Sequence, residues 1–362
     1  MGSVKHLLDM TQDELIEWLA TIDVKPFRGR QIRRWLYRSQ ADSFESMTDL
    51  PEALRHQLAG QLQLWSAEVA AHKLAEDGTE KLLFQLNDRE KIESVLIRDG
   101  ARRTICISTQ VGCAMGCVFC ATGLDGVVRN LTTGEIVEQM LRLARLLPPA
   151  PEGKPLPERL SNIVVMGMGE PLANLDSLLP ALAEAESDHG LGISPRRITI
   201  STVGLPAAID RLSDMGCKYS LAVSLHAADD DLRNELVPVS KKIPLADIMS
   251  AADRYFEVSG RRLTFEYVLL GGINDREEDA RRLAKLLSGR GAMLNLIPYN
   301  PVAGLPYKTP EVTRVRRFVD ILGERSVNVQ IRRRKGAKID AACGQLRRSQ
   351  ASQPDTVVQL PS

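Results

Sequence analysis

The apolar and polar positions divide the chain into a helical front segment and a longer segment in which strands and helices alternate. In the front segment, Thr11 and Glu14 can form a capping box ahead of the amphipathic run ELIEWLATI, which predicts a helix. Two more helices are expected, one from about Gly29 to Arg38 and one that starts at Pro51. From about residue 80 the pattern becomes that of short strands, in EKLLFQL, KIESVLI and RTICIS.

Strands and helices then alternate regularly as far as about residue 335. The strand-like runs are NIVVMG, RRITIS, KYSLAVSLH, RLTFEYVL, AMLNLIPY and VNVQIR, and the helical stretches lie near 132–147, 175–187, 205–215, 245–258, 277–288 and 311–323. Strands separated by helices of this length are typical of parallel βαβ units. About six or seven units fit residues 100–335, fewer than an eight-fold barrel needs. We therefore predict an α/β fold with a partial (β/α) barrel, whose chemistry lies at the C-terminal ends of the strands.

The pattern predicts three regions: a helical accessory domain over residues 1–75, the barrel over 76–346 and a disordered tail over 347–362. The proline-rich segment 148–157 is expected to be an exposed loop. No apolar run approaches the roughly 18 residues of a membrane span, and the first residues lack the apolar block of a signal peptide. We therefore expect a cytoplasmic protein.

The charge is balanced overall but unevenly distributed. The 47 basic and 46 acidic residues leave a net charge of +1, yet residues 25–38 hold six basic residues and no acid. Residues 332–348 hold seven basic residues and Asp340. These stretches either hold a polyanion between a front and a back module or are two solvated faces. The three tryptophans Trp18, Trp35 and Trp65 all lie in the front segment, where they can form its core; Trp35 could instead stack on bases.

The cysteines carry the strongest chemical signal. Four of the six lie within fifteen residues, and Cys113, Cys117 and Cys120 follow a predicted strand with the spacing C-x3-C-x2-C. Such crowding in a long chain is not typical of a secreted disulfide framework. A structural zinc site would need a fourth ligand, and none lies nearby in the sequence. The spacing suits a [4Fe–4S] cluster with one iron left open for a substrate or cofactor.

Polar residues end the strands that follow. The run NIVVMGMGEPLAN places Gly169 and Glu170 at a strand end, where glycine lets the backbone approach a ligand and a carboxylate can receive an ammonium group. Ser201, Ser224, Leu225, His226 and Asn300 lie at the ends of later strands. Each alone could be an ordinary structural residue, but together they predict a cofactor site at one barrel mouth. The cysteine loop and the βα alternation resemble the radical S-adenosylmethionine superfamily, and GMGEP resembles its glycine-rich methionine-binding strand.

Two further cysteines narrow the resemblance. Cys343 lies in IDAACGQL, and Cys106 ends the strand that leads into the cysteine loop. Free cysteines are usually small buried residues, and Cys217 is interpreted so; two extra thiols near a radical centre indicate covalent sulfur chemistry. Over about residues 90–346 the chain resembles the bacterial dual-specificity ribosomal and transfer RNA adenine-C2 methyltransferases. The motifs are KIESVLI, CISTQVGCAMGCVFCATG, VVMGMGEPLAN, ITISTVG, SLAVSLHA, LIPYNP and IDAACGQL, and the basic front module also matches.

This resemblance implies a set of roles. Cys113, Cys117 and Cys120 would hold a [4Fe–4S] cluster, and S-adenosylmethionine would be bound by Gly169, Glu170, Ser201, Ser224, Leu225, His226 and Asn300. Cys343 would carry the methyl group, Cys106 would release the product by forming a disulfide, and Glu93 would accept a proton. The substrates would be 23S ribosomal RNA and transfer RNA, bound in part by the front domain. A flavodoxin-like or ferredoxin-like donor would supply electrons to a monomer.

The resemblance leaves some points open. The family usually has Arg-Gly-x-Asp-Ile before its C-terminal cysteine, whereas this chain has Lys335, Gly336, Ala337, Lys338 and Ile339. For Glu93 the alternative is a surface carboxylate on a strand. A relative that methylates adenine C8 shares every cysteine named above. A glycyl-radical activase is the alternative from another class, but it needs neither Cys106 nor Cys343.

Overall fold

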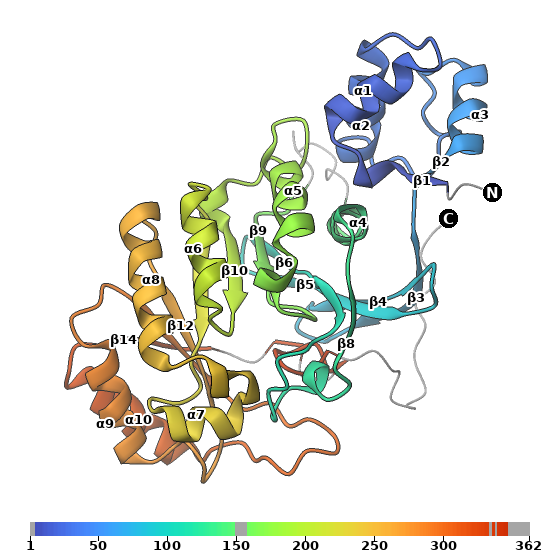
Figure 1. The fold of residues 1–362 in the computed structure, drawn as a ribbon. Coiled ribbons are helices and arrows are strands. Elements are labelled where there is room, and N and C mark those ends of the chain that lie inside the picture. Colours follow the sequence, from blue (N-terminus) through green and yellow to red (C-terminus); the bar gives the residue numbers. More distant parts are fainter. Residues whose placement is uncertain (1–3, 149–157, 333–334, 337–338, 347–362) are drawn as a thin grey trace.

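The computed structural model describes residues 4–148, 158–332, 335–336 and 339–346 (Figure 1). The predicted tail 347–362 lies outside the described residues, as do nearly all of the proline-rich segment and part of the second basic stretch. In this part of the chain no helix is long and apolar enough to cross a membrane.

The front of the chain forms a small helical domain set apart from the sheet (Figure 1). Its helices are α1 (Gln12–Ala20), α2 (Phe27–Tyr37) and α3 (Glu52–Gln61), and β1 (Lys5–His6) pairs in parallel with β2 (Leu62–Gln63). The capping box of Thr11 and Glu14 is present at the start of α1, as predicted. The three tryptophans pack, partly buried, against the hydrophobic core. The indole of Trp35 also donates to Asp49 at 2.5 Å, which confirms the structural interpretation of this residue.

Ten strands form one sheet in the order β14-β13-β12-β11-β10-β9-β6-β5-β4-β3. The neighbours from β14 to β6 are parallel, and those from β6 to β3 are antiparallel. The antiparallel part consists of β3 (Ala67–Leu74), β4 (Glu80–Leu86) and β5 (Lys91–Asp99). The parallel part consists of β6 (Arg102–Cys106), β9 (Asn162–Val165), β10 (Ile198–Thr202), β11 (Ser220–Ser224), β12 (Thr264–Leu269), β13 (Met293–Pro298) and β14 (Asn328–Ile331). The predicted α/β partial barrel is confirmed. The strand β3 belongs to its sheet, although it lies within residues 1–75, the range predicted for the front domain.

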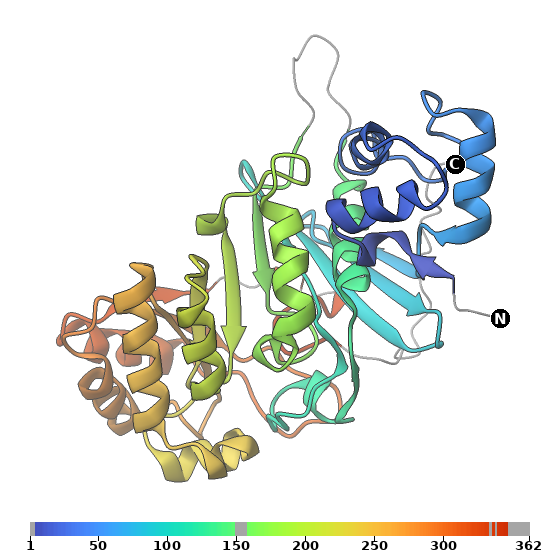
Figure 2. The ribbon, with the colours of Figure 1, turned by 45° about the horizontal axis from the view of Figure 1, so that its top comes forward.

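Helices connect the parallel strands and cover them with their apolar faces (Figure 2). They are α4 (Thr133–Ala144), α5 (Leu175–Glu186), α6 (Pro206–Asp214), α8 (Leu245–Ser259), α9 (Glu277–Leu287) and α10 (Val312–Gly323), close to the predicted stretches. An additional short helix, α7 (Asp230–Leu236), is followed by the 3-10 turn η5 (Pro238–Lys242) and lies between β11 and α8. The strand-end residues therefore meet at one edge of the sheet.

A short hairpin encloses the cysteine loop. It pairs β7 (Gln110–Gly112) with β8 (Val127–Asn130) and contains the 3-10 turn η2 (Ala121–Gly123). Gly112 has a φ of 79°, and a Cβ atom there would lie 2.0 Å from the carbonyl oxygen of Gly126. Only glycine allows this crossing, which brings the two ends of the cysteine loop together.

Candidate active site

The predicted site residues from successive strand ends converge on one cavity of about 160 Å³. Those that line it are Cys113, Cys117, Cys120, Gly169, Glu170, Ser201, Ser224, His226, Asn300 and Cys343. Three predicted residues are not part of this lining. The side chain of Leu225 is fully buried, Cys106 lines an adjoining cavity, and Glu93 lies on β5.

The cysteine loop is held in place by main-chain hydrogen bonds. The N–H of Cys113 donates to Gly126 at 2.8 Å, and the N–H of Val118 donates to Leu236 of α7 at 3.1 Å. Burial raises the pKa of the Cys113 thiol to about 12, and it also raises the pKa values of Cys117 and Cys120. Three partly buried thiolates on one loop would therefore need a bound cationic group to offset their desolvation.

The donor set fits an iron–sulfur cluster better than a single ion. Within the described ranges, no group of three His, Cys, Asp or Glu residues is placed to hold one metal ion. A single zinc ion would need four ligands that converge to about 2 Å from one point. A cluster spreads its thiolate ligands over separate irons, and three cysteines in the wall of one cavity fit that arrangement.

Glu170 is a buried carboxylate at the end of the glycine-rich strand. Its two oxygens accept hydrogen bonds from the N–H groups of Leu172 at 3.0 Å and Val203 at 2.9 Å. Burial raises its pKa to about 7. At Gly169, which has a φ of 104°, an added Cβ would lie 2.7 Å from that of Gln110. The glycine is thus required for packing against the neighbouring segment as well as at the cavity wall.

His226 is held in one tautomer. Its Nδ1 accepts a hydrogen bond from the N–H of Val268 at 3.1 Å, and its ring packs edge-on against Phe119 with the centroids 4.8 Å apart. Burial, together with the charge of Arg233, lowers its pKa to about 3. The ring is therefore neutral at physiological pH, and its proton is on Nε2.

Sequence reasoning missed Glu266, a buried carboxylate of β12 in the cavity wall. It lies beside Ser224 in the strand register, and Asn295 donates to its Oε1 at 2.8 Å. Its Oε2 and the Oδ1 of Asn300 are buried and have no hydrogen-bond partner among the described residues. Buried polar atoms normally have partners, so these two acceptors suit a ligand that carries hydrogen-bond donors. An acid inside the apolar run RLTFEYVL was the available signal.

The two distant thiols share a second cavity of about 510 Å³. Cys106 and Cys343 both line it, and Cys343 also lines the first cavity, together with Asn300 and Arg332. Both cysteines are free thiols, so they form no disulfide in this structure. Burial, and to a smaller extent the proximity of Cys343, raises the pKa of Cys106 to about 12. The structure thus places both thiols in the second cavity, and Cys343 lies where the two cavities adjoin.

Glu93 is buried and ion-paired, so the alternative of a surface carboxylate is wrong. Its Oε1 lies 2.8 Å from the Nζ of Lys81, which is buried on β4. The same Nζ donates to the carbonyl oxygen of Asp340 at 3.1 Å. The pair therefore contacts the segment that carries Cys343, although Glu93 does not line either cavity described above.

The segment that carries Cys343 is held from two sides. On the antiparallel side, Asp77 accepts a hydrogen bond from the N–H of Gly336 at 3.0 Å. Lys335, where the family usually has arginine, lies 3.6 Å from Asp99. On the cluster side, the N–H of Ala121 donates to the carbonyl oxygen of Gly344 at 2.8 Å. Lys338, the other departure from the family pattern, lies outside the described residues.

The arginines of α2 do not form one uniform basic face. Arg33 is buried in an ion pair with Glu184 of α5, and its guanidinium lies over the ring of Tyr37. Arg34 pairs with Asp49, whereas Arg30 is exposed. An open hollow of about 460 Å³ is lined by Gln12, Phe27, Arg30, Gln31, Arg34, Arg38, Asp188 and His189. Arg33 therefore joins the front domain to the barrel, whereas Arg30, Arg34 and Arg38 are exposed.

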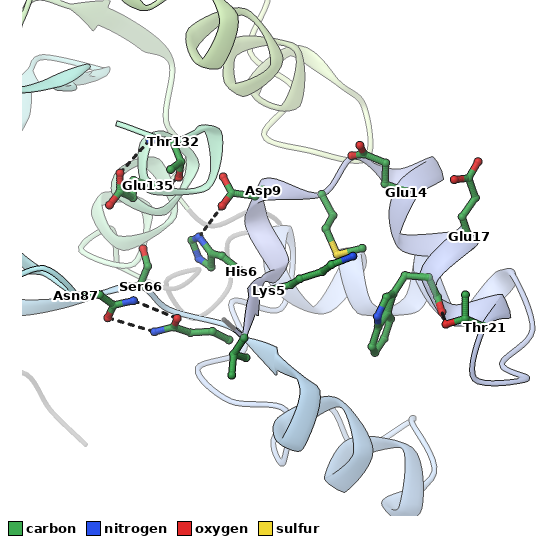
Figure 3. A pocket seen from close by; sticks show the side chains of 14 residues that line it. Lys5, His6, Asp9, Glu14, Glu17, Thr21, Ser66, Asn87, Thr132 and Glu135 are labelled. Carbon is green, nitrogen blue, oxygen red and sulfur yellow. Dashed lines mark hydrogen bonds and ion pairs between the residues drawn. The ribbon is translucent and has the colours of Figure 1, made fainter. Parts of the chain in front are cut away.

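A larger cavity, of about 660 Å³, lies where the front domain meets α4. Figure 3 shows His6 and Asp9 directed toward each other, beside Thr132 and Glu135. The imidazole of His6 lies 3.7 Å from Asp9 and 3.7 Å from the buried Glu138. Glu138 also accepts hydrogen bonds from the linker residue Ser66. These contacts connect the two parts of the chain, and none of the predicted site residues lies here.

Comparisons with known proteins agree along most of the chain. Residues 5–64 match the sequence family described as the ribosomal RNA large subunit methyltransferase N-terminal domain, and residues 107–284 match the radical SAM superfamily. The chain is 61% identical over 344 residues to the "Probable dual-specificity RNA methyltransferase RlmN" of Rhodopirellula baltica, covering 95% of this chain and 91% of that protein. It is 46% identical over 340 residues to the "Dual-specificity RNA methyltransferase RlmN" of Anaeromyxobacter dehalogenans, covering 94% and 91%.

A solved structure is similar over almost the same length. The crystal structure of a radical SAM methyltransferase from Sphaerobacter thermophilus superposes with a TM-score of 0.90 at 44% identity. The match covers 95% of this chain and 100% of that chain. Both the front domain and the barrel therefore have a counterpart of known structure.

Proposed function

The chain belongs to the RlmN family of dual-specificity RNA methyltransferases within the radical SAM superfamily, and we propose that it methylates C2 of an adenosine in 23S ribosomal RNA and in transfer RNA. The observation that carries this proposal is the position of Cys106 and Cys343. Both thiols line one cavity, and Cys343 also faces the cavity of the three cluster cysteines. A methyl carrier must reach both the methyl donor and the RNA base, and the position of Cys343 in the walls of both cavities supports this role.

Adenine C2 has no lone pair, so it cannot displace a methyl group from a sulfonium directly. Cys113, Cys117 and Cys120 would hold a [4Fe–4S] cluster, which when bound supplies the electron for reductive cleavage of S-adenosylmethionine. Glu170, as a carboxylate in the wall of the same cavity, would receive the ammonium group of that cofactor. The neutral Nε2–H of His226 and the free acceptor of Asn300 would complete its hydrogen bonding.

The chain's own thiols would carry the covalent steps. The thiolate of Cys343 takes the methyl carbon of one S-adenosylmethionine as the sulfonium C–S bond breaks, which leaves S-adenosylhomocysteine. A 5′-deoxyadenosyl radical from a second S-adenosylmethionine would remove a hydrogen atom from the methyl group on Cys343, and the resulting S–CH2 radical would add to C2. Glu93 would accept the proton of C2, and the remaining unpaired electron would leave to the external electron carrier. Cys106, as a thiolate, would then attack the sulfur of Cys343, so that the S–S bond forms as the S–CH2 bond breaks and the methylene carbon takes up a proton to become the methyl group of the released base. Because burial raises the pKa of Cys106 to about 12, this attack requires removal of its proton. An external low-potential donor, flavodoxin-like or ferredoxin-like, supplies electrons and restores both thiols.

RNA would be held in part by the front domain. Arg30, Arg34 and Arg38 line an open hollow together with the half-exposed ring of Phe27, a combination that suits phosphates and a stacked base. Arg33 is not part of this surface, because its guanidinium is buried against Glu184.

The test is to digest ribosomal and transfer RNA after reaction and to compare the product with 2-methyladenosine and 8-methyladenosine standards by mass spectrometry. We expect 2-methyladenosine from both RNAs. A product that elutes with the 8-methyl standard would favour the antibiotic-resistance relative. Absence of any methylated adenosine, with a glycyl radical formed in a partner protein instead, would favour the activase.

A further inference from the structure

Arg233 of α7 is a fully buried cation without a carboxylate partner. Only 1% of its surface is exposed, and it forms no ion pair with a carboxylate among the described residues. It donates instead to three main-chain carbonyls, those of Val203 at 2.6 Å, Leu225 at 3.2 Å and Ser224 at 3.3 Å. In the part of the chain that the structure describes, its Nη1 has no hydrogen-bond partner. Buried charges are normally paired, and the described residues supply no carboxylate to pair with this one.

The guanidinium lies where α7 meets the cysteine loop. The N–H of Val118 in that loop donates to Leu236 of α7 at 3.1 Å, and Phe119 packs in one apolar cluster with Leu236 and Val237. Two of these carbonyls belong to Val203, which follows β10, and Ser224, which ends β11, and both residues line the cavity of the three loop cysteines. The third belongs to Leu225, which is fully buried next to Ser224. Arg233 is thus behind the wall of the candidate cluster site.

The electrostatics agree with this placement. Burial lowers the pKa of Arg233 to about 10, so the side chain is still cationic at neutral pH, and the nearby Cys117 opposes the lowering. The thiol of Cys117 is the cluster ligand whose charge interacts with Arg233. Asp230, on the same helix, is the other anionic group that acts on it, but it is not within ion-pair distance and accepts the N–H of Leu245.

We propose that Arg233 is the counter-charge of the iron–sulfur cluster and that it raises the reduction potential of that cluster. Adding an electron makes the cluster and its thiolates more negative, so a fixed cation nearby stabilises the reduced form more than the oxidised form. Its hydrogen bonds to main-chain carbonyls fix the guanidinium, and its burial limits screening by water and salt. Arg233 is a positioning and tuning residue that does not touch the substrate. The inference rests on the cluster in the proposed function.

A purely structural role is the competing explanation, because the same hydrogen bonds join the ends of two strands to α7. The reduction potential separates the two explanations. A structural role predicts lower thermal stability and lower iron content but an unchanged potential in the molecules that still hold a cluster.

The experiment uses the full chain, reconstituted anaerobically with iron and sulfide, as wild type and as Arg233→Gln, Arg233→Met and Arg233→Lys. The matched control is Arg254→Gln, which removes an exposed cation paired with Asp210 on the outside of the barrel. Iron content and the midpoint potential, followed by electron paramagnetic resonance during a redox titration, are measured without RNA.

We expect Arg233→Gln and Arg233→Met to disfavour reduction at least tenfold, which is about 59 mV more negative for a one-electron couple. Arg233→Lys and Arg254→Gln should stay within a threefold change. Wild-type potentials in Arg233→Gln and Arg233→Met would overturn the inference. If neither variant retains a cluster, the midpoint potential of Arg233→Lys is the deciding measurement. A tenfold weaker tendency of the cluster to be reduced in that charged variant would overturn the inference. Failure of the wild type itself to bind iron would contradict the proposed function instead.

Discussion

The two ends of the ten-stranded sheet contribute to the site in different ways. At the parallel end, Glu170, Ser201, Ser224 and Asn300 follow or end their strands and meet at one edge, because parallel strands present their carboxyl ends together. At the antiparallel end, Lys81 and Glu93 lie within strands β4 and β5 and act through their side chains. The topology of the parallel end brings its residues together in the first cavity, whereas the antiparallel end depends on contacts with a distant segment.

That distant segment carries Cys343, the proposed methyl carrier. Lys81 and Asp340 are 259 residues apart in the chain, as are Asp77 and Gly336, and both pairs hydrogen-bond. The first strands of the sheet therefore position a thiol from the far end of the chain beside the cavity that the parallel strands form. This division predicts that changes at the parallel end affect cofactor binding, whereas changes at the antiparallel end affect the thiol chemistry.

The largest effect is expected where the parallel end meets the cluster. Cys113→Ala, Cys117→Ala or Cys120→Ala should abolish iron binding, because each removes one of three protein ligands of the proposed cluster. Iron content and the absorbance near ~400 nm typical of such clusters, after anaerobic reconstitution, measure this. Cys217→Ala is the matched control and should retain iron, since Cys217 lines neither cavity. Full cluster occupancy in any of the three variants would contradict the assignment of these cysteines as cluster ligands.

Variants of Cys106 and Cys343 should bind the cluster normally but should not complete the methyl transfer to RNA. Cys106→Ala should accumulate a covalent protein–RNA adduct through Cys343, because no thiol is left to attack the Cys343 sulfur. A shifted band on a denaturing gel detects the adduct. Cys343→Ala, alone or with Cys106→Ala, should give neither adduct nor methylated RNA. Normal turnover by Cys106→Ala would show the methyl-cysteine mechanism to be wrong for this protein.

At the antiparallel end, Lys81→Met should remove the ammonium group that lies 2.8 Å from the buried carboxylate of Glu93. Removing one partner of a buried ion pair is destabilising, so the free energy of unfolding should fall. RNA methylation should fall at least tenfold, with normal iron content, and Lys81→Arg should restore part of it. Lys91→Met, a half-buried lysine near Glu93 on the same strand, is the control. Equal losses of stability in Lys81→Met and Lys91→Met would contradict the role given to the pair.

A smaller effect, a pH dependence of ligand affinity, is expected from Glu170. Its pKa of about 7 means that the carboxylate is ionised above pH 7 and protonated below it, and only the ionised form attracts an ammonium group. The affinity for S-adenosylhomocysteine should therefore fall up to tenfold per pH unit below about pH 7, as measured by calorimetry on reconstituted protein. Glu170→Gln should bind more weakly and lose this pH dependence. A wild-type affinity that is constant from about pH 5.5 to 7.5 would exclude Glu170 as the ammonium partner.

Much of the fold could be predicted from local pattern. The capping box at Thr11, the alternation of strands and helices and the C-x3-C-x2-C spacing are all properties of short segments, and each predicts structure without knowledge of distant residues. Parallel strands also imply that their polar ends meet, which is why Ser201, Ser224 and Asn300 could be grouped in advance. That these residues bind S-adenosylmethionine stays a prediction.

Burial and pairing were decided only by the tertiary structure. Arg33 looks like its basic neighbours in the sequence, yet it is buried against Glu184, which follows some 150 residues later. Arg233 looks like a surface residue of a short acidic helix but is fully buried, and Glu266 faces the cavity from within an apolar strand. Short-range periodicity reports the conformation of a segment, because it reflects side-chain direction within that segment. The partner and the solvent exposure of a charge depend on segments far away in the chain, which no local pattern contains.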